Sequence, residues 1–165
     1  MSAVFAYNAR PKIRASGFLL EDGALLCVKQ KLRERTHWNI PGGSLEPGET
    51  LEECVVREIR EETGLEVNVV ELLYVCDRKR DSGRTEVDVS FLLQRTGGTL
   101  KHNYVGSDGE ILSEVKFIPV KELTSYGFAP EFQDLVERGL PGRGQYQGDF
   151  HALFGRTEDV VSTVA

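Results

Sequence analysis

Residues 43–65, GSLEPGETLEECVVREIREETGL, contain the signals that decide the fold predicted for this chain. Thr50 precedes an apolar and acidic run, and Glu53 follows three residues later, which is the capping-box pattern of a helix start. Gly64 suits the left-handed backbone position that commonly follows the last turn of a helix. We therefore predict a helix over residues 51–63, preceded by a loop rich in glycine and proline.

The predicted helix carries three glutamates, Glu58, Glu61 and Glu62, on the side that also carries its apolar residues. On a helical wheel with about 100° per residue, Glu58 and Glu62 fall inside the apolar stripe and Glu61 falls at its edge. The stripe itself consists of Leu51, Cys54, Val55 and Ile59. Buried carboxylates without partners are costly, so three neighbouring ones need a compensating positive charge.

Two sources of positive charge are open to these glutamates. A hard divalent cation prefers carboxylate oxygens, and the spacing i, i+3, i+4 lets all three side chains reach one site. Alternatively, arginines such as Arg57 neutralise part of the cluster, and its role is structural. The preceding loop favours the metal, because glycine lets backbone groups approach an ion or a phosphate closely. Glu49 lies eight residues before Arg57, so an ion pair could hold this loop against the helix.

The rest of the sequence predicts strands and a second helix. Asp22-Gly23 predicts a tight turn between two strands, and Ser82-Gly83 marks a loop between two more. The expected strands cover residues 13–20, 24–28, 67–76, 86–93 and 115–120, and the second helix covers 130–138. Residues 29–37 are read as a polar loop, and residues 38–49 contain too many glycines and prolines for a regular element. This mixture predicts an α/β sandwich with a mixed sheet.

Length and composition predict one domain over residues 1–165, with an irregular, glycine-rich extension at 141–165. No apolar run is long enough for a membrane span, and the first residues lack the apolar core of a signal peptide, so we expect a cytoplasmic protein. The formal net charge of −6 argues against a long nucleic-acid partner but not against a small phosphorylated ligand. Three cysteines in apolar runs, without a CxxC pair, are read as buried thiols.

The stretch at 43–65 resembles the box of the Nudix hydrolases, GX5EX7REUXEEXGU, in which U is a bulky aliphatic residue. Every specified position matches, and the matching residues are Gly43, Glu49, Arg57, Glu58, Ile59, Glu61, Glu62, Gly64 and Leu65. The upstream sequence WNIPGG, residues 38–43, is also typical of that family. The likeness extends over most of residues 12–123.

The resemblance implies a Nudix-type α/β/α sandwich and a pyrophosphohydrolase that depends on Mg2+ or Mn2+. The substrate would be a small nucleotide-type molecule, a nucleoside diphosphate linked to another moiety, attacked by water at phosphorus. The implied metal ligands are Glu58, Glu61, Glu62 and the carbonyl of Gly43. Arg57 would pair with Glu49 and orient the helix. Glu61 would be the base that takes the proton of the attacking water.

Candidate residues outside the box are assigned by position and charge. Glu110, in a loop ahead of the strand that contains Phe117, is expected to be a further metal ligand or the base instead of Glu61; a solvated loop acid is an equal reading. Arg33, Arg35 and Arg78 are expected to contact the anionic substrate, with solvated loop charge as the alternative for each.

Two alternatives concern the whole protein. A Nudix domain can sense a nucleotide ligand without catalysis, but such domains often have eroded boxes and this box is complete. The basic turn that contains Arg78 also leaves open a homodimer, in which this turn contacts the partner subunit.

Overall fold

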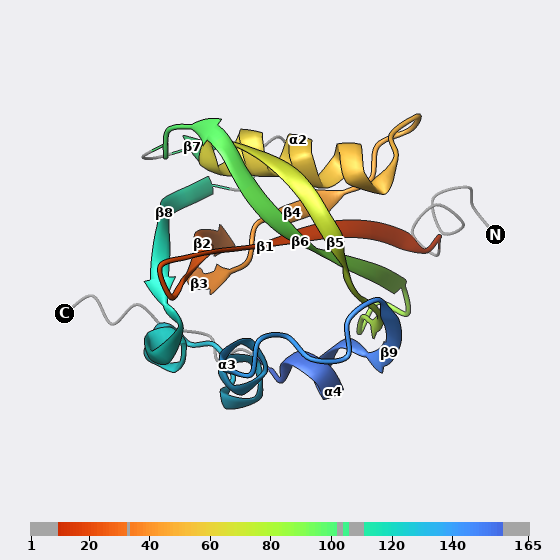
Figure 1. The fold of residues 1–165 in the computed structure, drawn as a ribbon. Coiled ribbons are helices and arrows are strands. Elements are labelled where there is room, and N and C mark those ends of the chain that lie inside the picture. Colours follow the sequence, from red (N-terminus) through yellow and green to blue (C-terminus); the bar gives the residue numbers. More distant parts are fainter. Residues whose placement is uncertain (1–9, 33, 102–103, 106–110, 157–165) are drawn as a thin grey trace.

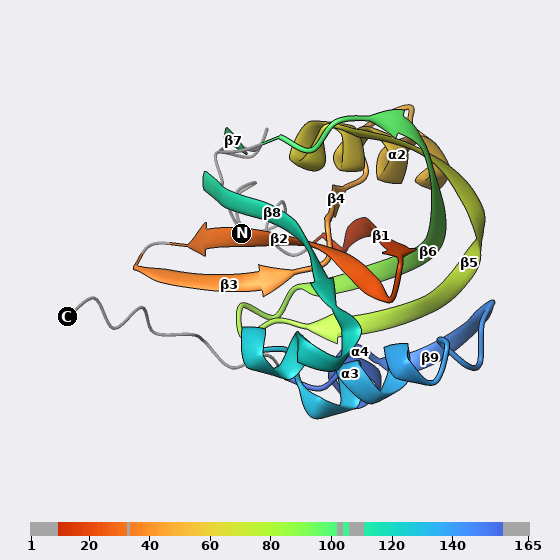
Figure 2. The ribbon, with the colours of Figure 1, turned by 60° about the vertical axis from the view of Figure 1, so that its left-hand side comes forward.

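A mixed β-sheet lies between helix α2 on one side and helices α3 and α4 on the other, so the protein is an α/β/α sandwich (Figure 1). The structure, a computed structural model, describes residues 10–32, 34–101, 104–105 and 111–156. The same three layers are visible after rotation by 60° (Figure 2). The predicted fold class is therefore confirmed.

The elements have the following bounds in chain order. The strands are β1 (Lys12–Glu21), β2 (Ala24–Leu32), β3 (Arg35–Asn39), β4 (Gly42–Ser44), β5 (Leu65–Lys79), β6 (Thr85–Gly98), β7 (Tyr104–Val105), β8 (Ile111–Pro119) and β9 (Gln145–Asp149). The helices are α2 (Leu51–Thr63), the 3-10 helix η1 (Val120–Tyr126), α3 (Pro130–Glu137) and α4 (Phe150–Phe154). No helix in the described ranges is long and apolar enough to cross a membrane.

Strand β1 is the centre of the sheet, whose strand order is β7-β8-β2-β1-β6-β5-β9. It runs parallel to β6 along most of its length, and β9 runs parallel to β5, whereas the other pairs are antiparallel. On its other edge, β1 pairs with β4 through Arg14↔Ser44 and with β2 only near its end, through Leu20↔Leu25. One strand therefore has two different neighbours on the same edge.

The side chains of β1 alternate between two hydrophobic cores, because successive residues of a strand point to opposite faces. Ala15 and Leu19 belong to the core under α2, and Phe18 belongs to the core under α3 and α4. The α2 side of the first core is formed by Cys54, Val55 and Ile59. All three cysteines are buried free thiols, as predicted.

The predicted signals for α2 and for the first hairpin are confirmed. The hydroxyl of Thr50 accepts a hydrogen bond from the Glu53 amide at 3.1 Å, and the Glu53 carboxylate accepts one from the Thr50 amide at 2.8 Å. Gly64 follows the helix with φ of 80°. Asp22 and Gly23 both have positive φ in the turn between β1 and β2, as expected for the tight hairpin turn.

Three expectations about irregular segments were wrong. Residues 29–37 are not a loop, since β2 continues to Leu32 and β3 begins at Arg35 and pairs back with it. Residues 38–49 include the short strand β4. In the predicted irregular extension at 141–165, residues 145–154 form β9 and α4. These strands are fixed by backbone hydrogen bonds to a neighbouring strand, which side-chain periodicity does not reveal.

Replacing Phe154 by alanine should destabilise the protein by about 3–5 kcal/mol, because this side chain fills a closed aromatic core. Phe154 is 4% exposed. Its ring packs against the rings of Phe18, Tyr74, Phe132 and Phe150. Urea unfolding measures the loss, and Val70→Ala, at a position that is 54% exposed, should cost less than about 1 kcal/mol. Equal losses in the two variants would show that the C-terminal segment is not part of the core.

Candidate active site

Strand β4 brings two glycines of the box region against helix α2. Gly43 pairs with Ala15 of β1, and a Cβ atom added to Gly43 would overlap the carboxylate of Glu58. A Cβ atom added to Gly42 would overlap the backbone of β1. Only glycine lets the strand lie this close to both neighbours.

The carboxylates of Glu58 and Glu62 are buried against this strand, with exposures of 5% and 6%. The Glu62 carboxylate accepts a hydrogen bond from the Gly42 amide at 3.0 Å. Glu61 is partly exposed, with 31% of its side chain accessible. This difference in exposure agrees with the helical wheel, which placed Glu58 and Glu62 in the apolar stripe and Glu61 at its edge.

The guanidinium of Arg57 lies within ion-pair distance of four carboxylates, which belong to Glu46, Glu49, Glu58 and Glu61. It donates from Nε and Nη2 to both oxygens of Glu49, which is the predicted ion pair. Its Nη1 donates to Glu58 at 2.9 Å and to Glu61 at 3.2 Å. Its Nη2 also donates to the carbonyl of Ser44 at 3.2 Å. One side chain thus ties β4, the loop and two turns of α2 together.

The Arg57–Glu49 contact changes the pKa of both groups. Hydrogen bonding to Arg57 lowers the pKa of Glu49 to about 2, since it stabilises the carboxylate form. Hydrogen bonding to Glu49 and then to Glu58 raises the pKa of Arg57 above its ordinary value. Both groups are therefore charged at neutral pH.

The donor set of this cluster fits a divalent cation. Glu49, Glu58, Glu61 and Glu62 bring four carboxylates together with the single guanidinium of Arg57, so negative charge is in excess. Carboxylate and backbone carbonyl oxygens are the ligands that hard cations prefer. In the described ranges, no three acidic, histidine or cysteine side chains already converge in a metal-holding geometry. Hydrogen bonds to Arg57 and to the Gly42 amide account for their present positions.

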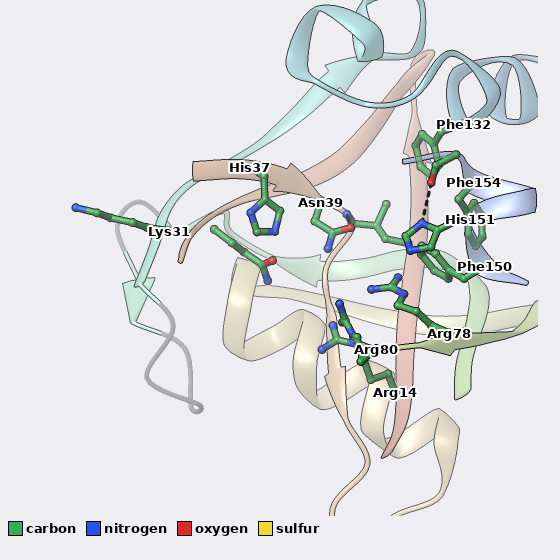
Figure 3. Close-up of a pocket in the computed structure, with 13 residues that line it drawn as sticks. Arg14, Lys31, His37, Asn39, Arg78, Arg80, Phe132, Phe150, His151 and Phe154 are labelled. Atoms are coloured by element: carbon green, nitrogen blue, oxygen red, sulfur yellow. Dashed lines mark hydrogen bonds between the residues drawn. The ribbon is translucent and has the colours of Figure 1, made fainter. Parts of the chain in front are cut away.

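A pocket of about 280 Å³ lies on the other side of β1, between that strand, β2, β3 and the C-terminal helices. Its lining residues are Arg14, Gln30, Lys31, His37, Asn39, Ile40, Arg78, Arg80, Phe132, Phe150, His151, Phe154 and Gly155. The side chains of Arg14, Arg78 and Arg80 gather on one part of it, and aromatic rings line another (Figure 3). Arg14 precedes Ala15, the register partner of Gly43, so the pocket and the Gly43–Glu58 contact lie on opposite faces of β1.

The model of the NUDIX domain matches residues 10–138 of this chain. The chain belongs to the Nudix hydrolase family. The Nudix match covers both faces of β1 described above but ends before β9 and α4.

Named relatives agree with this assignment. The ADP-ribose pyrophosphatase of Methanocaldococcus jannaschii is 36% identical over 123 residues, which are 73% of this chain and 69% of that protein. The 8-oxo-dGDP phosphatase NUDT18 of Mus musculus is 41% identical over 85 residues, which are 51% of this chain and only 25% of that protein. A NUDIX hydrolase from Nitrosomonas europaea shares the fold, with a TM-score of 0.65 and 21% identity over 81% of this chain and 90% of its own. The chain is thus a Nudix hydrolase, of the class that hydrolyses derivatives of nucleoside diphosphates.

The structure brings together all the candidates of the Nudix box but separates the other candidates. Arg78 lines the pocket, whereas Arg35 is exposed on β3 and is not among the lining residues. Arg33 and Glu110 lie outside the described residues, so their predicted roles stay predictions.

The sequence analysis missed several lining residues of the pocket. Arg14 alternates with Ala15 along β1 and could have been found from the period of two that puts it on the opposite face. Phe150 and His151 were missed because their segment was read as irregular. The three aromatic positions 150, 151 and 154 offered only a weak helical signal.

The Gly43→Ala variant should bind Mn2+ at least about 10-fold more weakly than the wild type, since its Cβ must displace the Glu58 carboxylate. Isothermal titration calorimetry with Mn2+ measures the change. Gly97→Ala is the matched control, because a Cβ there comes no closer than 3.9 Å to another atom. Wild-type Mn2+ affinity in the Gly43→Ala variant would contradict a metal site at this contact.

The Glu49–Arg57 pair should make stability depend on acid pH. The pKa of Glu49 is depressed in the folded protein, so its stabilising contribution is complete above its ordinary pKa of 4.5 and is lost as pH falls towards about 2. Urea unfolding of the wild type and Glu49→Gln should therefore differ most above pH 5 and converge between pH 4.5 and 2. A constant difference across that range would refute the depressed pKa.

Proposed function

We propose that this Nudix hydrolase uses Mg2+ or Mn2+ to cleave a nucleoside diphosphate that is linked to another moiety. The observation that carries the proposal is the packing of Glu58 and Glu62 against the Gly42–Gly43 backbone, with Glu61 beside them. We assign the metal to these three carboxylates and the Gly43 carbonyl. When bound there, a divalent cation neutralises diphosphate charge and lowers the pKa of a water molecule.

Glu61 is the proposed general base, as the sequence analysis expected. It is more exposed than the other two carboxylates of the proposed metal site, at 31% of its side chain against 7% for Glu58. A base must reach the attacking water, and a buried carboxylate at the β4 contact is less able to do so. The hydrogen bond from Arg57 Nη1 holds the Glu61 carboxylate in place at the rim of the cluster.

Arg57 and Glu49 are proposed as positioning residues. Arg57 donates to the carboxylates of Glu58 and Glu61, and its remaining nitrogens donate to Glu49 and Ser44. Loss of Glu49 would free the guanidinium to move away from β4. Because Arg57 restrains two of the proposed metal ligands, such a movement would disturb metal binding without removing a ligand.

The substrate class follows from the family and from the names of two relatives. One relative is named for ADP-ribose and another for 8-oxo-dGDP, and both molecules contain a nucleoside diphosphate. This chain spans only part of each relative, so either substrate is a proposal for it. A panel of ADP-ribose, 8-oxo-dGDP, nucleotide sugars, dinucleotides and nucleoside triphosphates, assayed with Mg2+ and with Mn2+, tests the proposal. No hydrolysis in the panel, with tight binding of one compound, would favour a ligand-sensing domain instead.

Several finer predictions accompany this proposal. Glu110 as an alternative base, and Arg33 and Arg35 as substrate contacts, await variants at those positions. A homodimer is tested by sedimentation of the purified chain. A cytoplasmic location is tested by fractionation of cells that produce the protein.

The Glu62→Gln variant should lose at least about 100-fold in kcat, because it removes a proposed metal ligand, and loss of an outer-shell partner alone typically costs 10–100-fold. Its amide can still accept the Gly42 hydrogen bond, so circular dichroism and urea unfolding should stay close to wild type. Glu52→Gln, on the exposed side of the same helix, is the matched control and should keep wild-type turnover. Wild-type turnover in Glu62→Gln would remove Glu62 from the proposed metal site.

A further inference from the structure

The pocket between β1, the β2–β3 hairpin and the C-terminal helices is cationic in a chain whose formal net charge is −6. Arg14, Arg78, Arg80 and Lys31 line it, and none of the described residues that line it is Asp or Glu. Such a concentration of positive charge suits a negatively charged ligand, because a cavity with one sign of charge focuses the field on its occupant.

Two of these arginines have carboxylate partners behind the pocket. Arg80 lies 2.8 Å from Glu86, and Arg14 lies 3.9 Å from the buried Asp88. Asp88 in turn accepts a hydrogen bond from Ser16 at 3.0 Å. These contacts orient Arg14 and Arg80 from strands β1 and β6 without placing a carboxylate in the pocket.

Arg78 is held differently. In the described part of the chain it forms no ion pair within 4 Å, and its Nε is buried without a hydrogen-bond partner. Its guanidinium carbon lies 3.6 Å from the centre of the Phe150 ring (Figure 3). Burial lowers the pKa of Arg78, which reflects a cation that is poorly solvated by water. A guanidinium stacked in this way is pre-organised, so little side-chain freedom remains to be lost when an anion binds.

The C-terminal segment puts Phe150 in this position. Strand β9 pairs in parallel with β5, with Asp77 opposite Asp149, and helix α4 begins at the next residue. The Asp149 carboxylate accepts a hydrogen bond from the Ala152 amide and caps α4. Arg78 directly follows Asp77 on β5, so the pairing of two strands sets the stacking of Phe150 on Arg78. This segment lies beyond the 10–138 family match.

The pocket and the acidic cluster share strand β1. Arg14 pairs with Ser44, and the adjacent Gly43 touches Glu58. Arg14 and Ala15 are consecutive in β1 and point to opposite faces, so the arginines and the carboxylate cluster lie on the two sides of this one strand.

We propose that residues 139–156 complete a phosphate-binding subsite, in which Arg78, Arg14 and Arg80 bind a phosphate group of the nucleotide and Phe150 positions Arg78. The subsite extends the proposed function, on which it rests for the identity of the ligand as a nucleotide. Its occupant is the phosphate-bearing part of the substrate. The segment is thus a specificity element that the Nudix box does not supply.

Calorimetry in the presence of EDTA tests the subsite without a contribution from a divalent metal. The probes are adenosine, AMP, ADP and inorganic phosphate. Affinity should rise from adenosine to AMP to ADP. Arg78→Ala should weaken ADP binding at least about 10-fold, as expected for loss of a charge-assisted hydrogen bond. Equal affinities for adenosine and ADP, or unchanged ADP affinity in Arg78→Ala, would overturn the proposal.

Matched variants separate the subsite from net charge and from stability. Arg60→Ala removes the same charge from the exposed face of α2, where Arg60 binds Glu66, and should leave ADP affinity unchanged. If Arg78→Ala fails to fold, Arg14→Ala provides the same measurement from another strand. An Arg60→Ala variant as weak as Arg78→Ala would show a long-range charge effect and refute the subsite.

The role of Phe150 is tested by conservative replacement. Phe150→Ala should weaken ADP binding about 5-fold, in the range of a partly buried cation–π contact, and Phe150→Tyr should restore it. Failure of Phe150→Tyr to restore binding would remove the ring as a positioning group. Tight inorganic phosphate binding with no gain for ADP would assign the pocket to free phosphate instead and overturn the nucleotide proposal.

Different experimental outcomes would refute the subsite and the proposed function. Glu62→Gln should not hydrolyse substrate, yet in EDTA it should still bind ADP more tightly than adenosine. Wild-type protein that binds ADP in EDTA but hydrolyses nothing in the panel would refute the proposed function and leave the subsite standing. Hydrolysis with no phosphate-dependent binding in EDTA would refute only the subsite.

Discussion

The contact of Arg57 with four carboxylates is the interaction on which the candidate site depends. Like charges on one helix repel, and Glu58 and Glu62 are also largely removed from water. Arg57 offsets part of this cost with hydrogen bonds to Glu49, Glu58 and Glu61. The offset is incomplete, because one guanidinium cannot neutralise four carboxylates. The excess charge is the physical reason for assigning a cation to this cluster in the proposed function, and the hydrogen bond from Arg57 to the Ser44 carbonyl fixes β4 against α2.

Strand β1 lies between the acidic cluster and the arginine-lined pocket. Ala15 pairs with Gly43 and faces the α2 core, whereas Arg14 points to the pocket on the other face. The alternation of a strand therefore places the acidic cluster and the arginines back to back, one residue apart in sequence. This requires β4 to replace β2 as the neighbour of β1 at Arg14–Ser16, which opens the space between β1 and the β2–β3 hairpin. The sheet topology, and not the box alone, sets the distance between charge clusters of opposite sign.

The sequence predicted those parts of the fold and site whose signals are local. The capping box at Thr50, the positive φ at Gly64 and the wheel positions of Glu58 and Glu62 depend only on near neighbours, and all were correct. Strands β3 and β9 were missed because long-range backbone pairing decides them, with β9 held by β5 some seventy residues earlier. Charged residues in 29–37 and glycines in 141–148 hid this pairing, since neither shows the alternation of a half-buried strand.

The C-terminal segment that the sequence analysis read as irregular forms one wall of the pocket. Residues read as an irregular extension form a strand and a helix that carry Phe150 to Arg78, and Phe154 closes the aromatic core behind them. The acidic cluster is built from α2 and β4, whereas this wall is built from β5, β9 and α4. In the proposed function and its subsite, chemistry and ligand choice therefore depend on different strand pairings. Under this proposal, a change in the C-terminal wall alters which moiety is accepted while Arg57 keeps its hydrogen bonds to Glu49, Glu58 and Glu61, because none of these four residues belongs to β9 or α4.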